Sequence, residues 1–76
     1  MAFDQGSVVY DPEELGRAIR ARRKKLGYTQ GQVAAFNRCS VRFVSELERG
    51  KSGAGIGQVL RIMNSIGLDL AAIERG

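Results

Sequence analysis

The chain contains no histidine, no tryptophan, one cysteine and one proline among its 76 residues. Without histidine, the sequence offers no Ser-His or Cys-His pair for nucleophilic catalysis, and one cysteine cannot assemble the ligands of a zinc site. The eight carboxylates are spread along the chain, which argues against a paired catalytic acid and base. We therefore expect no catalytic residue, no metal and no cofactor, and an enzyme is the remotest interpretation.

Long apolar runs are absent as well. No stretch approaches the ~20 apolar residues that a membrane span requires, and the N-terminus lacks the basic start and apolar stretch of a signal peptide. The single cysteine, Cys39, excludes an internal disulfide and fits a reducing compartment. The sequence therefore predicts a cytoplasmic protein with no membrane partner.

Positive charge, in contrast, is abundant and unevenly distributed. Twelve Lys and Arg residues against eight Asp and Glu residues give a net charge of +4. Six of the twelve basic residues lie within the nine positions from 17 to 25. Such clustering favours a polyanionic partner, because each neutralised phosphate releases condensed counterions. A solubilising surface is the alternative that charge alone leaves open.

Capping and stop signals predict the first helix. Asp11 can cap a helix, Pro12 suits the first helical position and Gly27 suits the stop. The expected helix covers residues 12–26. Its apolar positions recur at helical spacing and predict one buried face, formed by Leu15, Ala18, Ile19 and Leu26.

Two short helices follow in quick succession. Thr29 can cap the first of them, in which Val33, Ala34 and Phe36 are expected to turn inward. After a break at 37–39, Ser40 can cap the second, which ends at Gly50. Helices separated by so few residues must cross steeply, which is the geometry of a helix-turn-helix.

The remainder predicts one more helix and an extended terminus. A glycine-rich connector over 51–57 leads to a fourth helix, whose apolar stripe spans 59–66 and stops at Gly67. Residues 68–73 are expected to be extended, and a lone terminal strand needs a partner, which a second subunit could supply. Residues 8–10 either add a short strand or cover the core. The predicted divisions are a tail over 1–10, a helix-turn-helix domain over 11–67 and a C-terminal dimerisation strand over 68–76.

The stretch 29–51 carries the most specific pattern. Thr-Gln opens the first short helix, Val-Ala lies inside it, Ser40 begins the second, and Glu-Arg-Gly-Lys closes it. This pattern resembles the motif of the phage-repressor-like Xre regulators, over about residues 15–67. The resemblance implies an all-α, lambda-repressor-like fold of four to five helices with a short C-terminal β-strand for dimerisation. It also implies sequence-specific binding to double-stranded DNA, with the second motif helix in the major groove.

The same resemblance assigns base-reading positions. In this family, the exposed side chains early in the second motif helix read base edges; here they are Val41, Arg42, Phe43, Ser45 and Glu46. Arg42 suits the O6 and N7 acceptors of guanine, and Glu46 suits the amine of cytosine. Val41 or Phe43 suits a thymine methyl group.

Phosphate contacts and one ion pair follow in the same way. Free N–H groups and the helix dipole favour phosphate at helix N-termini, so Gln30 and Ser40 are expected to contact DNA phosphate. Lys51, just past the second motif helix, is expected to touch phosphate, whereas Arg38 is either a phosphate contact or simply solvated. Arg23 and Glu48 match a family pair that ties the first helix to the end of the second motif helix.

The turn between the two motif helices departs from the family. Arg38 stands where the family has glycine, and Asn37 stands where it has an apolar residue. Asparagine tolerates the left-handed conformation better than most residues, so we expect the turn to be shifted by one position, onto Asn37. Cys39 occupies a small apolar position and is expected to be buried as a packing residue.

The flanking segments 10–15 and 60–70 resemble HipB-type antitoxins. In that family, the C-terminal strand pairs across a two-fold axis, and the dimer represses its own operon at inverted repeats. The dimer also binds a HipA-type serine/threonine kinase toxin. The resemblance implies that this chain does likewise, with dimerisation through Ile66, Leu68, Leu70, Ala72 and Ile73.

Other interpretations remain open at this point. The nearest is a free-standing Xre-family regulator or phage-type repressor without a toxin partner. Another is a protein-interaction module that keeps the fold and has lost DNA binding. In a repressor dimer of this kind, the two recognition helices are expected to lie about one DNA turn, ~34 Å, apart.

Overall fold

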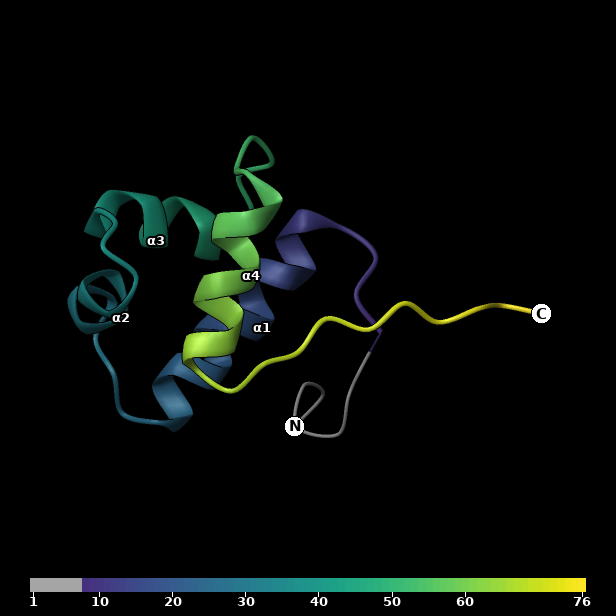
Figure 1. The fold of residues 1–76 in the computed structure, drawn as a ribbon, viewed down its shortest axis with the longest axis horizontal. Coiled ribbons are helices and arrows are strands. Elements are labelled where there is room, and N and C mark those ends of the chain that lie inside the picture. Colours follow the sequence, from purple (N-terminus) through teal and green to yellow (C-terminus); the bar gives the residue numbers. More distant parts are fainter. Residues whose placement is uncertain (1–7) are drawn as a thin grey trace.

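The computed structural model describes residues 8–76 and contains four helices over that range. They are α1 (Pro12–Lys25), α2 (Gln30–Phe36), α3 (Val41–Glu48) and α4 (Ile56–Ser65) (Figure 1). The four helices expected from the sequence are confirmed, with ends that differ by a few residues. Within residues 8–76, no helix has both the length and the apolar character to span a membrane. Residues 1–7 of the expected N-terminal tail lie outside the described part of the chain.

Side-chain caps fix where the first three helices begin. The Asp11 carboxylate accepts a hydrogen bond from the backbone N–H of Glu14 at 2.8 Å. The Ser40 hydroxyl accepts in the same way from the N–H of Phe43 at 3.0 Å. Thr29 and Gln32 form a reciprocal capping box at the start of α2. Each bond satisfies an N–H group that has no partner inside its helix, so these short polar residues define the helix starts.

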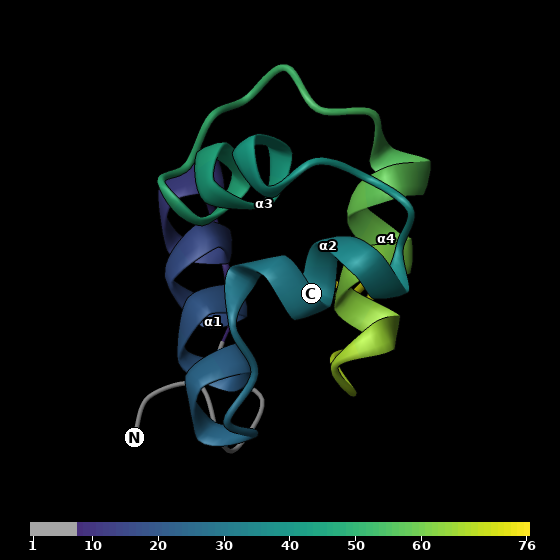
Figure 2. The ribbon, with the colours of Figure 1, turned by 90° about the vertical axis from the view of Figure 1, so that its left-hand side faces the viewer.

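The four helices surround one apolar core. Helices α1 and α4 stand on either side of α2 and α3, and the connector 49–55 arches between α3 and α4 (Figure 2). Every helix contributes a buried side chain to the centre; the most completely buried are Ile19, Val33, Val44, Ile62 and Ile66. Two expected core residues lie outside it, since Leu26 is 40% exposed and Phe36 is 52% exposed.

Helices α1 and α3 approach each other closely at Gly16. A Cβ atom at this position would lie 2.5 Å from the carbonyl oxygen of Glu48, far inside van der Waals contact. The close approach places the middle of α1 directly against the C-terminal end of α3. Glycine at position 16 therefore sets the distance at which polar side chains from the two helices can meet.

The turn between α2 and α3 differs from the expectation. Arg38 is in the left-handed conformation, with φ at +53°, whereas Asn37 has φ at −107°. The predicted shift of the turn onto Asn37 is therefore wrong. The Asn37 amide instead donates to the carbonyl of Val33 at 2.9 Å and to the hydroxyl of Ser65 at 3.0 Å. These two bonds hold Asn37 in place, and the chain reverses at Arg38. Cys39 is half-buried against the core, and this burial raises the pKa of its thiol.

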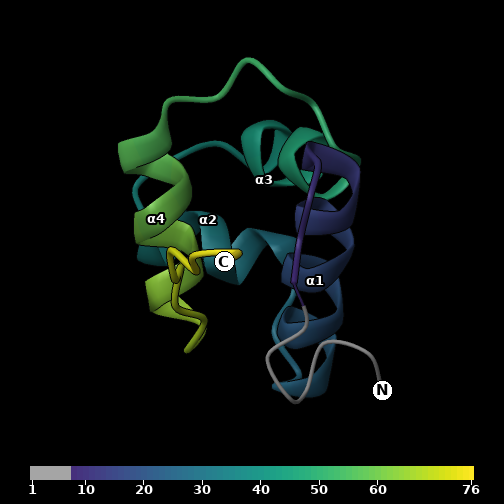
Figure 3. The same cartoon turned by 90° about the vertical axis from the view of Figure 1, so that its right-hand side faces the viewer.

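The expected C-terminal strand is not formed. Residues 68–76 are irregular, and so are residues 8–10, where a short strand was one alternative; the described part of the chain contains no strand. A strand requires a second strand to accept and donate its backbone hydrogen bonds, and residues 8–76 of a single copy offer none. The two terminal segments instead run past α1 and α4 on one side of the molecule (Figure 3).

The left-handed Arg38 leads to a stability prediction. Replacing Arg38 with glycine removes the clash between Cβ and the backbone, and should raise the free energy of unfolding by about 1 kcal/mol. Arg38→Ala is the matched control, because it removes the charge and keeps Cβ. Urea denaturation of both variants measures the difference. Equal stability of Arg38→Gly and Arg38→Ala would show that the backbone at position 38 is unstrained.

Candidate nucleic-acid interface

A buried pair of charged side chains joins α1 to α3. The Nε and Nη2 atoms of Arg23 donate to the two carboxylate oxygens of Glu48, at 2.6 and 2.9 Å. Arg23 is 8% exposed and Glu48 is 6% exposed. Such a two-pronged contact fixes both the distance and the plane of the partners. The structure thus brings together the two residues that the sequence nominated as a structural ion pair.

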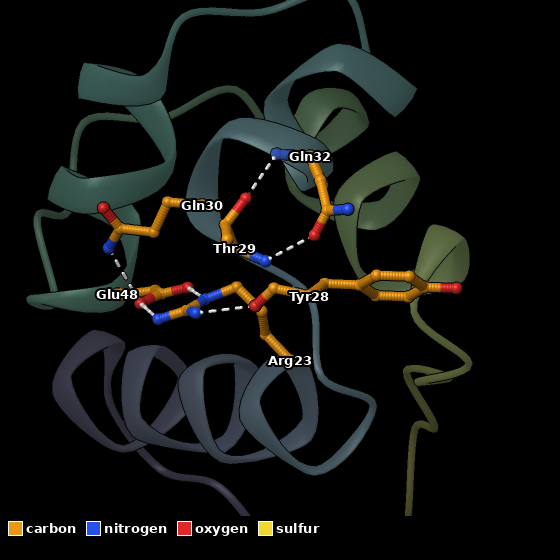
Figure 4. A network of polar contacts seen from close by, with 6 residues as sticks. All are labelled: Arg23, Tyr28, Thr29, Gln30, Gln32 and Glu48. Carbon is orange, nitrogen blue, oxygen red and sulfur yellow. Dashed lines mark hydrogen bonds and ion pairs between the residues drawn. The ribbon is translucent and has the colours of Figure 1, made fainter.

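Two further groups complete this polar network (Figure 4). The third donor of Arg23, Nη1, reaches the carbonyl oxygen of Tyr28 at 2.9 Å, in the loop between α1 and α2. The amide of Gln30, the first residue of α2, donates to Glu48 at 3.0 Å. The network therefore ties the end of α1, the start of α2 and the end of α3 together. Sequence reasoning missed the Gln30 contact, because it considered this side chain only as a phosphate ligand.

The network also controls the ionisation of Glu48. Burial raises the pKa of Glu48, but the hydrogen bonds from Arg23 and Gln30 outweigh this effect, so the pKa lies below its ordinary value of 4.5. The hydrogen bond to Glu48 likewise raises the pKa of Arg23. Both groups are therefore held in their charged forms.

Outside this buried contact, much of the surface of α3 is open to solvent. Val41 is 51% exposed, and the side chain of Arg42 is 84% exposed. Ser45 and Glu46 are half-buried on the same helix. Phe43 is also half-buried, but its ring packs against the core, which leaves less of it for a ligand. All five expected base-reading residues thus keep some accessible surface, and Val41 and Arg42 are the most exposed of them.

A second ionic cluster lies on this exposed side. Glu46 accepts from Arg42 Nε at 3.2 Å and from Lys51 Nζ at 3.3 Å. The hydrogen bonds from Arg42 and Lys51 lower the pKa of the Glu46 carboxyl. From the sequence, these three residues were expected to contact DNA separately. The spacing of Arg42 and Glu46, four positions apart on a helix, was the available signal for their pairing.

The expected phosphate ligands lie at several points around this face. Ser40 uses its hydroxyl to cap α3, and Gln30 uses one amide hydrogen on Glu48. Arg38 and Lys51 are exposed at the two ends of α3. Arg20 of α1 was counted only within the basic cluster, yet it is close enough to Glu48 for its charge to lower the pKa of that carboxyl. Among residues 8–76, no group of three or more potential ligands is placed to hold a metal ion.

The residues expected to join two subunits differ in their exposure. Ile66 is 1% exposed and packs in the core of its own chain, so it has no surface to offer a second copy. Leu68 is half-buried against the same core. Leu70, Ala72 and Ile73 are exposed along the irregular C-terminal segment.

Comparison with known proteins assigns this arrangement to a family. The sequence pattern of the helix-turn-helix domain matches residues 14–75. The uncharacterized HTH-type transcriptional regulator y4mF of Sinorhizobium fredii is 31% identical over 65 residues, which are 86% of each chain. The chain belongs to the helix-turn-helix family of transcriptional regulators. The competence pilus inhibition repressor of Acinetobacter baylyi is 45% identical over 40 residues, which span 53% of this chain and 36% of that repressor.

Solved structures of the helix-turn-helix family show the same fold. Two of these structures are a HipA-HipB-O2-O3 complex and a HipB-O4 20mer complex. Each matched structure has a TM-score of 0.83 and 20% sequence identity, and covers 92% of this chain and 99% of its own. The similarity extends over almost the whole chain and confirms the resemblance to HipB in fold.

The buried pair predicts how this helix-turn-helix domain responds to acid. Because the pKa of Glu48 is lower in the folded state, the unfolded chain takes up the proton first as pH falls. Stability from this group is therefore present at neutral pH and is lost below about pH 5. Glu48→Gln should cost about 3 kcal/mol at pH 7, since it leaves Arg23 buried without its counterion. The same variant should lose part of the pH dependence.

Urea titrations at several pH values measure both effects. Glu74→Gln is the matched control, because Glu74 is exposed in the C-terminal segment. The free energy of unfolding of this variant should fall with acid as steeply as that of the wild type. If Glu48→Gln lost stability with acid as steeply as the wild type, Glu48 would not be the titrating group.

Proposed function

We propose that this chain is a sequence-specific DNA-binding repressor that acts as a homodimer on an inverted-repeat operator. The observation that carries the proposal is that α3 is held in place at one end and is accessible along its length. Its C-terminal end is locked to α1 and α2 through Glu48, whereas Val41, Arg42, Ser45 and Glu46 keep surface that is exposed to solvent. An exposed helix held on a rigid support is what reading of the major groove requires.

The proposed contacts divide into two kinds. Base reading falls to Arg42, with Val41, Phe43, Ser45 and Glu46 beside it. Phosphate contacts position the helix, and they fall to Gln30, Arg38, Ser40 and Lys51. The net charge of +4 supports the electrostatic part of this binding.

A groove on the other side of the molecule supports the homodimer. It has a volume of about 690 Å³ and lies between α1, α4 and the two terminal segments. Among residues 8–76, eight large hydrophobic residues are exposed, and five of them line this groove: Val8, Tyr10, Ile56, Leu70 and Ile73. Apolar surface gathered in one place favours a protein partner. We propose that the segment 68–76 of a second copy covers it and there finds the strand partner that a single chain lacks.

We further propose that the operon encodes a HipA-type serine/threonine kinase toxin, which this chain binds as its antitoxin. The support is the fold, which matches HipB over 92% of the chain, including HipB in complex with HipA. A free-standing regulator remains the competing function, and the similarity to a competence pilus inhibition repressor supports it. Co-purification with the product of the adjacent gene would support the antitoxin function, and failure to co-purify would support the free-standing regulator.

The direct test is binding of the purified protein to the DNA upstream of its own coding sequence, with random DNA as competitor. Tight binding that survives the competitor, with two protected half-sites about one turn apart, is the expected result. Binding no better than to random DNA would overturn the repressor proposal and favour a protein-interaction module.

Two substitutions separate base reading from phosphate binding in that assay. Arg42→Ala should lose ~1–3 kcal/mol of discrimination at one base pair. Lys51→Ala should weaken all DNA alike and reduce the salt slope by about 1. Each variant is the control for the other. Uniform loss on all sequences for Arg42→Ala would remove it from the base contacts, and an unchanged salt slope would remove Lys51 from the phosphate contacts.

The dimer proposal predicts the effect of truncation. A chain that ends after Gly67 should sediment as a monomer and bind the operator poorly, because it lacks the C-terminal segment. A chain that ends after Ile73 is the matched control and should remain a dimer. Analytical ultracentrifugation measures both. Dimers of the shorter chain would show that residues 68–73 do not join the subunits.

A further inference from the structure

Three of the side chains proposed to meet DNA are paired with one another in the free chain. The carboxylate of Glu46 stands between the cations of Arg42 and Lys51, at 3.2 and 3.3 Å. The side chain of Glu46 is only 21% exposed, whereas those of Arg42 and Lys51 are 84% and 62% exposed. Two well-exposed cations thus converge on one less exposed carboxylate.

This arrangement reduces the attraction of the reading face for DNA in general. Two cations that share one carboxylate present a single net positive charge. When α3 enters a major groove, the phosphates and the N7, O6 and O4 acceptors of the bases all repel the Glu46 carboxylate. Only an exocyclic amine, on cytosine or adenine, can donate to it. The cost of bringing Glu46 into the groove therefore depends on sequence.

We propose that Glu46 determines specificity by penalising DNA that lacks an amine at its position. On such DNA, Glu46 keeps its bonds to Arg42 and Lys51, and these cations are withheld from bases and phosphates. On the operator, the exocyclic amine donates to the Glu46 carboxylate. Arg42 and Lys51 then become free to contact bases and phosphates. Discrimination thus comes from weakened binding to the wrong sequence as well as from attraction to the right one. This inference rests on the proposed DNA-binding function.

The test compares wild type with Glu46→Gln on two duplexes: the half-site pair protected in the footprint and a duplex of random sequence. Glutamine keeps the shape of the side chain and removes the charge that holds the cations. Affinity for the random duplex should rise roughly tenfold, and its dependence on salt should steepen by about 1 in the logarithmic slope, because a further cation becomes free to displace counterions. The ratio of operator to random affinity should fall by a similar factor.

Glu74→Gln is the control. It changes the net charge by the same amount, and the C-terminal segment that carries Glu74 leads away from α3 (Figure 1). This variant should leave the random-duplex affinity and its salt slope close to those of the wild type. Circular dichroism of each variant establishes that the helices are intact.

The possible outcomes separate this inference from the function on which it rests. If wild type prefers the operator and Glu46→Gln binds random DNA no more tightly, Glu46 only orients Arg42, and the inference is overturned alone. An equal gain by Glu74→Gln would also overturn it, since net charge would then explain the effect. If wild type shows no preference for the operator, the repressor proposal fails, and the role of Glu46 fails with it.

Discussion

The contact between Arg23 and Glu48 determines how the rest of the molecule is arranged. It joins the end of α1 to the end of α3 through two hydrogen bonds, and Gln30 extends it to the start of α2. The three helices could otherwise slide, because a core of small aliphatic side chains specifies volume better than it specifies direction. The contact between a planar guanidinium and a planar carboxylate specifies both the distance between the helices and their direction. Close approach of α1 and α3 at Gly16 makes the contact possible, since a larger residue there would hold the helices apart.

Helix α3 divides its two roles between carboxylates only two positions apart. Residues two positions apart on a helix are related by a rotation of about 200°, so they point to nearly opposite sides. Glu48 accordingly faces inward, where it is 6% exposed and bound to Arg23, whereas Glu46 lies on the solvent side with Arg42 and Lys51. The same residue type thus serves as a buried anchor and as part of the surface that is proposed to read DNA.

Local signals in the sequence predicted the helices well. Asp11, Thr29 and Ser40 mark helix starts through bonds made within three residues, so no knowledge of the tertiary fold is needed. Contacts across the fold were harder to foresee. Arg23 and Glu48 were paired through a family resemblance, but the bond from Gln30 to Glu48 spans 18 positions and depends on where α2 packs. The absence of a strand in residues 68–76 has a different cause, since a strand forms only with a second strand and the rest of the described chain supplies none.

Arg38 shows why intrinsic preference failed at the motif turn. Asparagine is the better left-handed residue of the two, yet Asn37 is held at φ −107° by bonds to Val33 and Ser65. The chain must still reverse before α3, so the left-handed position falls on Arg38. A residue with a side chain costs about 1 kcal/mol there compared with glycine. Strain of this kind persists where the side chain contributes to function. The proposed phosphate contact supplies such a reason, because the exposed guanidinium of Arg38 lies just before α3, the helix that is proposed to read the DNA.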